Sequence, residues 1–308
     1  MNFYIILSQN IFYNFFKYKY RLKTKILENF IKVGYIIKRL KIKRGYSMIK
    51  LIATDLDGTL LDNNGELNEE FNHVFNELYK KGVTFMAASG RQYPSLETLF
   101  ESVKDKMMFI AENGTFAVNK GEELLCDPMD KKNVEDIIDF TRAAENKEIL
   151  LNTKYTAYTE CKDEEFLKML DIYCSSVTVV DDLKDVKEDV LKTAIYDDRP
   201  IADHCQDYFD KFGDYMTVCT SGPHWLDIME KGVTKGKALE HIKERYGLKS
   251  EEVMIFGDQM NDLELIECGY HSYAMENAID ELKEKARFIA GKNSENGVLE
   301  KIKEVFNI

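Results

Sequence analysis

The chain has 308 residues, with 42 Lys and Arg against 54 Asp and Glu, six cysteines and 44% hydrophobic residues. This length suits one large domain or two ordinary ones, and the composition is globular rather than disordered. No apolar run approaches the ~20 residues that a membrane span needs. The net charge of −12 disfavours general nucleic-acid binding. We therefore expect neither a membrane nor a nucleic acid as partner.

Residues 1–47 differ sharply in charge from the remainder of the chain. They hold 11 Lys and Arg against one acid, whereas residues 48–308 hold 31 bases and 53 acids. One interpretation is a basic arm for membranes or nucleic acid. The other is translated upstream DNA, which the Ile-, Phe-, Tyr-, Asn- and Lys-rich composition favours. We expect the native protein to begin at Met48.

The six cysteines are scattered, with no CxxC pair and no His at zinc-finger spacing. Such a pattern in a chain of this size is typical of reduced thiols rather than of a disulfide frame or a metal site. We therefore expect a cytoplasmic protein.

From residue 49 onward, apolar runs alternate with segments of helical periodicity. Strands are predicted at 49–54, 83–88 and 107–111, and helices at 68–81 and 94–103. This alternation predicts a parallel α/β sheet.

The middle of the chain breaks this rhythm. Residues 126–215 are acidic and mix helix and strand signals, and after Asp227 the alternation returns. The returning elements are a helix at 235–246, a strand at 253–256 and a helix at 262–268. We therefore expect one α/β core made of residues 48–125 and 216–308, interrupted by an inserted domain at 126–215.

Two carboxylates follow the first predicted strand in the segment Asp55-Leu56-Asp57-Gly58. In extended chain Asp55 and Asp57 point the same way, and open α/β sheets place ligands at this end of their strands. An ordinary acidic turn is the plain alternative. A calcium loop also opens this way, and Glu66 stands at its twelfth position, but the DxDxDG spacing is missing and a strand precedes it.

Three further polar elements follow strands or precede helices. Ser89 and Gly90 come after the second strand, Lys235 begins a predicted helix, and Asp258 and Asp262 follow the strand at 253–256. Taken singly, each reads as a turn, a solvated lysine or a helix cap. Asn113-Gly114 predicts a hairpin turn.

Taken together and in this order, DLDGTL, Ser89, Lys235 and GDQMND resemble the haloacid dehalogenase (HAD) superfamily of phosphotransferases. More narrowly, residues 48–308 resemble the Cof-type phosphatases. The resemblance implies a Rossmann-like parallel-sheet core with an inserted α+β cap of the C2 type. Gln259 departs mildly from the family, which commonly has a small residue there.

The resemblance also implies a role for each matching residue. Asp55 would be the nucleophile that forms an aspartyl-phosphate, and Asp57 the general acid and then the base. Ser89 and Lys235 would bind the phosphoryl oxygens, and Gly90 and Asn261 would join them in contacting the substrate. Mg²⁺ would be held by Asp55, Asp258 and the backbone carbonyl of Asp57, with Asp262 acting through water. Mg²⁺ suits such all-oxygen ligands, and a cation lets a carboxylate approach a phosphate.

The expected function is Mg²⁺-dependent hydrolysis of a small-molecule phosphate ester, such as a sugar phosphate or a phosphorylated cofactor. The alternatives are a phosphomutase of the same superfamily and a non-catalytic phosphometabolite-binding protein. Lys192 and Arg199 are candidates for binding a second anionic group, with solvated surface charge as the favoured interpretation. We expect a monomer or a weak homodimer.

Overall fold

The structure is a computed structural model of the chain, and it describes residues 49–170 and 174–308. The predicted upstream extension, residues 1–47, lies outside the described residues. Within the described ranges, no helix is both long and apolar enough to cross a membrane. All six cysteines, each inside those ranges, are free thiols as expected.

The core is an eight-stranded sheet in the order β14-β13-β12-β1-β2-β3-β4-β5. All neighbours from β14 to β3 pair in parallel, and β4 and β5 add an antiparallel edge. The strands are β1 (Leu51–Thr54), β2 (Thr84–Ala88), β3 (Met108–Ala111), β4 (Phe116–Asn119), β5 (Glu122–Cys126), β12 (Val253–Gly257), β13 (His271–Met275) and β14 (Phe288–Ala290). The predicted parallel α/β sheet is confirmed.

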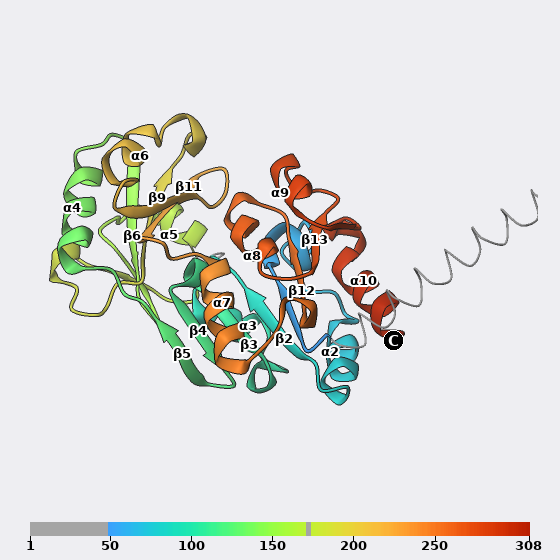
Figure 1. Cartoon of the computed structure of the whole chain (residues 1–308). Coiled ribbons are helices and arrows are strands. Elements are labelled where there is room, and N and C mark those ends of the chain that lie inside the picture. The colour runs from blue at the N-terminus through green and yellow to red at the C-terminus, as the bar shows by residue number, and fades with distance from the viewer. Residues whose placement is uncertain (1–48, 171–173) are drawn as a thin grey trace, which may run out of the picture. The chain divides into compact units, whose positions relative to one another are not determined.

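From β1 the chain adds β2 and β3 on one side of the sheet, and later β12, β13 and β14 on the other side. This reversal of direction determines which face of the sheet each helix covers. Right-handed crossovers put helices on opposite faces when the direction reverses. α2 (Phe71–Lys80) and α3 (Tyr93–Leu99) follow β1 and β2, whereas α8 (Leu263–Glu267) and α9 (Asp280–Lys285) follow β12 and β13. α7 (Lys235–Tyr246) packs on α8, and α10 (Gly297–Phe306) packs on α2 (Figure 1). The sheet is therefore covered on both faces.

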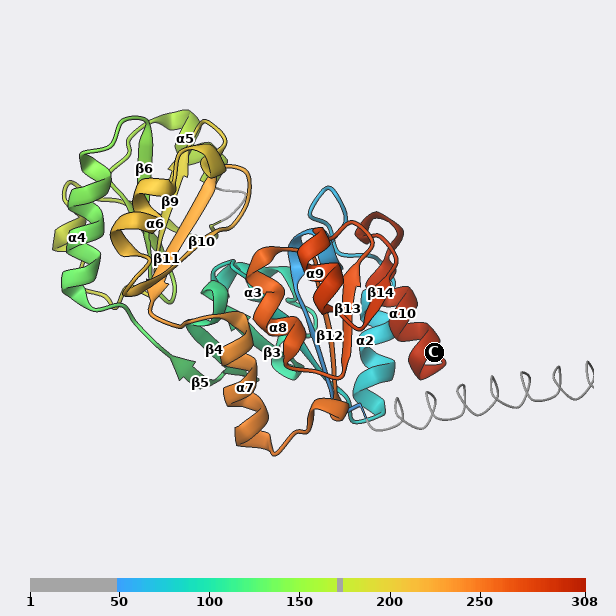
Figure 2. The same cartoon turned by 45° about the horizontal axis from the view of Figure 1, so that its top comes forward.

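The inserted cap is a second sheet in the order β10-β11-β9-β6-β7-β8. Its strands are β6 (Lys147–Asn152), β7 (Ala157–Thr159), β8 (Val177–Val179), β9 (Lys192–Asp197), β10 (Met216–Thr220) and β11 (Trp225–Glu230). It is mixed, because β7 and β8 pair in parallel and the others in antiparallel fashion. Two connections, from β5 to α4 and from β11 to α7, join it to the core (Figure 2).

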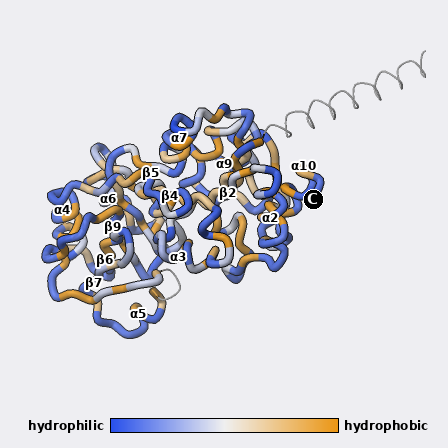
Figure 3. The backbone as a smooth tube through the Cα atoms, turned by 90° about the horizontal axis from the view of Figure 1, so that it is seen from below, coloured by the Kyte–Doolittle hydropathy of each residue, from blue (hydrophilic) through white to orange (hydrophobic). Residues whose placement is uncertain are grey.

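Alternation of side chains gives the cap sheet two different faces. Ile149, Leu151 and Ile195 pack with α4 (Lys131–Arg142) and α6 (Gln206–Phe212) in one apolar cluster. Their neighbours Leu150 and Ala194 point the other way and pack with α5 (Glu164–Leu170). Apolar and polar residues alternate along α4 and α2, as expected for helices that bury one side (Figure 3).

The end of the cap differs from the expected boundary at residue 215. β10 and β11, residues 216–230, belong to the second sheet rather than to the core. β11 pairs with β9 along Trp225–Ile228, so this hairpin completes the cap before the chain returns at α7. The apolar segment of β11 lies just before the motif that contains Lys235, so from sequence alone it is equally consistent with a strand of the core. This ambiguity explains why the predicted boundary is displaced.

Candidate active site

The functional side chains predicted from sequence gather at one edge of the core sheet. β1 and β12 are parallel neighbours, and the Asp55 N–H donates to the carbonyl of Phe256 at 3.0 Å. Asp258 follows β12, and Ser89 follows β2 on the other side of β1. The strand order reverses between β1 and β12, and such a switch point is where open α/β sheets bind their ligands.

Three buried carboxylates form the centre of the site. Oxygen atoms of Asp55, Asp258 and Asp262 all lie within 4.8 Å of one another. The ammonium of Lys235 lies 2.6 Å from Asp55 Oδ1 and 2.8 Å from Asp262 Oδ1. The Lys235 side chain is only 1% exposed. One cation therefore faces three buried acids.

The local sequence explains how these groups are held. Thr234 caps α7 by accepting the Lys237 N–H, which sets Lys235 at the first helical position. Asp262 Oδ2 accepts the N–H groups of Asp258 and Gln259, at 3.0 and 3.2 Å. These bonds fix Asp262 in the turn after β12.

The turn after β1 closes over the same cluster. Gly58 has φ of +80°, and a Cβ at this position would overlap the Asp258 carboxylate. The Thr59 hydroxyl donates to Asp258 Oδ1 at 3.1 Å. The DxDGT sequence thus places Asp55 and also shapes the space around Asp258.

The cluster is electrostatically unbalanced. Burial, together with the Asp262 and Asp258 charges, raises the pKa of Asp55 well above its usual range, although Lys235 opposes this. Burial and the Asp262 charge raise the pKa of Asp258 to about 6. Burial alone would lower the pKa of Lys235, but Asp262 and Asp55 raise it. The site therefore carries excess negative charge that a further cation would relieve.

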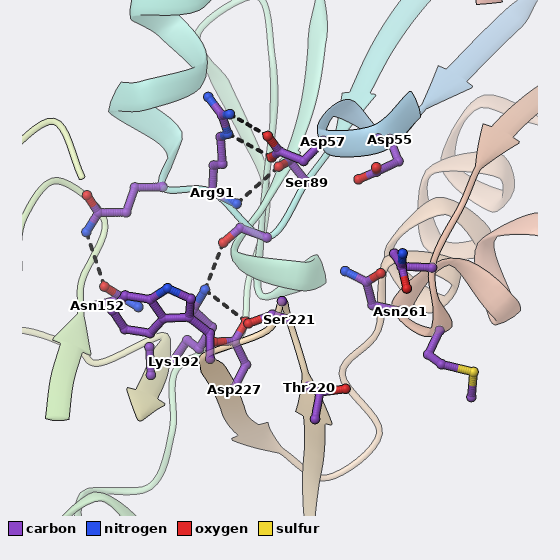
Figure 4. Close-up of a pocket in the computed structure, with 18 of the residues that line it drawn as sticks. Asp55, Asp57, Ser89, Arg91, Asn152, Lys192, Thr220, Ser221, Asp227 and Asn261 are labelled. Atoms are coloured by element: carbon purple, nitrogen blue, oxygen red, sulfur yellow. Dashed lines mark hydrogen bonds and ion pairs between the residues drawn. The ribbon is translucent and has the colours of Figure 1, made fainter. Parts of the chain in front are cut away.

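Asp57 lies apart from the three clustered acids. Its carboxylate is 57% exposed and accepts two bonds from Arg91, from Nη2 at 2.5 Å and from Nε at 2.8 Å. Ser89 is buried, and its hydroxyl accepts the Arg91 N–H at 3.1 Å. Figure 4 shows Asp57, Ser89 and Arg91 side by side at the cavity.

A cavity of about 660 Å³ opens between these motifs and the cap. Its core wall includes six of the predicted site residues, namely Asp55, Asp57, Ser89, Gly90, Asp258 and Asn261. The other two, Lys235 and Asp262, lie behind this wall and are almost fully buried. The cap wall includes Asn152, Lys192, Ala194, Trp225 and Asp227, which project from β6, β9 and β11 (Figure 4).

The two basic cap residues singled out in the sequence behave differently. The Arg199 side chain is 41% exposed and pairs with Asp197, in keeping with the surface interpretation. Lys192 is buried and lies 2.8 Å from Glu112, so the surface interpretation was wrong for Lys192. An apolar sequence context in β9 was the available signal for its burial.

Several site residues were not assigned from sequence. Asn113 does form the predicted hairpin turn, but its side chain also bridges two others. Its Oδ1 accepts from Asn261 Nδ2 at 3.1 Å, and its Nδ2 donates to Asp227 Oδ2 at 2.7 Å. No local sequence signal marks Asp227, because its partners come from distant parts of the chain. Arg91 directly follows Ser89-Gly90 and could have been noticed.

The chain is similar to known proteins of one family. The family model of the haloacid dehalogenase-like hydrolases matches residues 52–302. The chain is 30% identical to the 5-amino-6-(5-phospho-D-ribitylamino)uracil phosphatase YbjI of Escherichia coli (strain K12), over 83% of this chain and 96% of that protein. It is 28% identical to YitU of Bacillus subtilis (strain 168), which carries the same enzyme name, over 84% of this chain and 98% of that protein.

The crystal structure of SMU.1108c from Streptococcus mutans UA159 is similar with a TM-score of 0.78 and 28% identity, covering 84% of this chain and 100% of that one. The chain therefore belongs to the haloacid dehalogenase-like hydrolases. Within them it is a Cof-type phosphatase, built as a parallel-sheet core with an inserted mixed-sheet cap.

Proposed function

We propose that this protein is a Mg²⁺-dependent phosphatase that hydrolyses small phosphate monoesters through an aspartyl-phosphate on Asp55. The observation that carries the proposal is the buried cluster of Asp55, Asp258 and Asp262 beside a single ammonium, at one end of a ligand-sized cavity. Ligand pockets typically measure about 300–1,000 Å³, so the cavity suits a small ester.

The donor set fits a hard divalent cation. All the available ligand atoms are oxygens, and three acids face one Lys235 ammonium in a buried region. Asp55, Asp258 and the backbone carbonyl of Asp57 would hold Mg²⁺, with Asp262 supporting it through water. When bound, Mg²⁺ would neutralise negative charge on the phosphoryl oxygens and on the carboxylates.

The chain's own residues would divide the reaction between them. An Asp55 oxygen attacks phosphorus, the bond from phosphorus to the ester oxygen breaks, and Asp57 gives that oxygen a proton. Water, losing a proton to Asp57, then attacks the aspartyl-phosphate and releases phosphate. Ser89 already accepts the Arg91 N–H, which leaves its own proton to donate to a phosphoryl oxygen. Lys235 uses two N–H donors on acids, and its third is available for the same purpose.

The side chains that line the cavity opposite the three acids indicate which class of substrate would fit. Trp225 offers a planar apolar surface beside Ala194, and Gln92 Nε2 donates to Asn152 Oδ1 at 3.3 Å. Gln92 Oε1 is buried with no hydrogen-bond partner among the described residues, so an N–H or O–H of the leaving group would satisfy it. Together with the names of YbjI and YitU, this favours a phosphorylated polyol that carries a polar ring, ahead of simple sugar phosphates.

A panel of phosphate esters tests the proposed function. We expect free phosphate to be released with Mg²⁺, release to stop with EDTA and to return when Mg²⁺ is restored. The ring-bearing polyol phosphate should show the highest kcat/KM in the panel. Phosphate assay and phosphorus NMR are run together. Isomer formation without phosphate release would identify a phosphomutase, and ester binding without turnover would identify a binding protein; either result contradicts the proposal.

The raised pKa of Asp258 predicts a pH-dependent stability difference in EDTA. When folding raises the pKa of an Asp from 3.8 to about 6, the ionised side chain at pH 7 lowers the stability of the folded state. Protonation of the carboxylate removes this loss of stability. D258N should therefore be more stable than the native chain at pH 7, by on the order of 2 kcal/mol. The difference should shrink as the pH falls from about 6 towards 3.8.

Urea unfolding at several pH values, in EDTA and in Mg²⁺, measures this effect. With saturating Mg²⁺ the order should reverse, because the native chain gains metal-binding free energy that D258N has lost. A native chain that is more stable than D258N in EDTA at pH 7 would contradict the assigned charge imbalance.

A further inference from the structure

A second buried ion cluster links the cap to the loop after β2. We name it the cap–loop network and define it as Gly90, Glu112, Asn113, Lys192 and Asp227. Lys192 and Asp227 come from cap strands β9 and β11, and the other three from the core. The Lys192 Nζ lies 3.2 Å from Asp227 Oδ2 (Figure 4). It also lies 2.8 Å from the Gly90 carbonyl oxygen and 2.8 Å from Glu112 Oε2.

The surroundings of Lys192 define what it can do. An ammonium has three N–H donors, and three oxygens of the protein surround it at these distances. Its side chain is 7% exposed although it reaches the cavity wall. Burial alone would lower the pKa of Lys192, but Asp227 and Glu112 raise it, so it stays charged. Lys192 is thus committed to the protein rather than available for a second anionic group of the substrate.

The partners of Lys192 hold the predicted phosphoryl-binding turn. The carbonyl of Arg91 accepts the Glu112 N–H at 3.1 Å, and the carbonyl of Ser89 accepts the Asn113 N–H at 3.0 Å. A Cβ on Gly90 would lie 2.9 Å from Asn113 Oδ1, so the two segments are in close contact. Lys192 donates to the carbonyl of Gly90, the residue between Ser89 and Arg91 in the sequence. The turn is therefore tied to residues 112 and 113 and, through Lys192, to the cap.

The backbone at the same place is strained. Glu112 and Asn113 have φ of +50° and +57°, and the left-handed region is unfavourable for a Glu. Such strain persists only where the surroundings enforce it. Here the Lys192–Glu112 ion pair and the Asn113–Asp227 hydrogen bond, both across the boundary between core and cap, hold the strained pair.

We propose that Lys192 is a positioning residue, a cap ammonium that holds the Ser89–Arg91 turn and, through Asp227 and Asn113, the side chain of Asn261 in place for the phosphoryl group. This inference rests on the proposed function, because the Ser89–Arg91 turn binds a phosphoryl group only if the protein acts on phosphate esters. It follows that the cap completes the phosphoryl-binding site as well as surrounding the leaving group.

The test replaces Lys192 by Met in the full-length chain, with p-nitrophenyl phosphate and inorganic phosphate as probes. Both probes reach the phosphoryl site without a second anionic group. We expect K192M to lower kcat by about 10- to 100-fold, the scale set by small misplacements in active sites. The dissociation constant of inorganic phosphate, measured by calorimetry with Mg²⁺, should rise about tenfold. Unchanged values of both would overturn the proposal.

Two further variants separate positioning from stability. Lys147 is a matched control, because it is a cap lysine with a 5% exposed side chain, 2.8 Å from buried Asp197 and outside the cavity wall. K147M should lower Tm as K192M does but leave kcat and phosphate affinity unchanged. K192M/E112Q removes the unpaired buried acid and should recover Tm without recovering kcat. If kcat returns together with Tm, or if K147M lowers kcat equally, Lys192 has only a structural role.

Failure of the proposed function would give a different result from failure of this inference. A native chain that hydrolyses no ester overturns the proposed function. The phosphate calorimetry still decides the inference in that case: weaker phosphate binding by K192M than by K147M supports the network, and equal binding by the two variants overturns it.

Discussion

Replacement of Asp55 by Asn is expected to lower kcat by at least about 10⁴-fold while the protein stays folded. The amide keeps the size of the carboxyl group and an oxygen that can accept the Lys235 bond, which is 2.6 Å long in the native chain. It lacks the negative charge that attacks phosphorus, so no aspartyl-phosphate can form. The loss should appear equally with every ester in the panel.

The stability of D55N should move in the opposite direction from its activity. The pKa of Asp55 lies well above its usual range because of burial and the Asp262 and Asp258 charges, so the anion at position 55 is unfavourable at neutral pH. Without metal, D55N should therefore be as stable as the native chain or more so. Initial rates and thermal melts in EDTA measure the two effects, and D105N, at an exposed position in the 3₁₀ helix Lys104–Lys106, is the control. Undiminished turnover by D55N would refute the nucleophile assignment.

The parts of the site that could be predicted from sequence are those that follow a strand directly. Asp55 and Asp258 come at the ends of β1 and β12, and parallel strands bring their ends to one edge. Ser89 follows β2 in the same way, and Thr234 before Lys235 marks a helix start. Local signals of this kind place Asp55, Ser89, Lys235 and Asp258 at the ends of strands or the start of a helix, whereas their joint role came from the resemblance to a family. The structure brings all four positions together.

The parts that could not be predicted depend on pairing between distant segments. The Asp57–Arg91 ion pair joins the loops after β1 and β2, and nothing in either loop specifies the other as partner. The contacts of Lys192 with Glu112 and Asp227 require the cap to be folded and seated first. For the same reason the cap was predicted to end at 215, because only the pairing of β11 with β9 shows where it ends.

The site contains two buried lysines, each between two acids, and the difference between them is informative. Lys192 donates a hydrogen bond to a carbonyl and forms ion pairs with Glu112 and Asp227. Lys235 meets Asp55 and Asp262 while a third acid, Asp258, lies in the same cluster without an ammonium of its own. The first arrangement ties the cap to two core segments and suits a fixed structural contact. The second leaves both a donor and a negative charge for a ligand and a cation.

Replacement of Lys235 by Met is expected to have the largest combined effect on stability and activity. Removing the ammonium that two buried carboxylates share should destabilise the protein by about 3–5 kcal/mol in EDTA, because their charge is left uncompensated. Activity should fall at least about 10³-fold, since a donor to the phosphoryl oxygens is lost as well. Mg²⁺ should restore part of the stability, because it neutralises the same acids, but little of the activity.

Urea unfolding with EDTA or Mg²⁺, together with initial rates, checks this prediction. Lys237 lies two residues further along α7 and is exposed, so K237M is the control and should change neither quantity. If K235M alone fails to fold, K235M/D262N removes one of the stranded charges and should fold while remaining inactive. A K235M protein with native stability in EDTA would show that Lys235 does not neutralise the cluster, and it would contradict the assignment of charged carboxylates to Asp55 and Asp262.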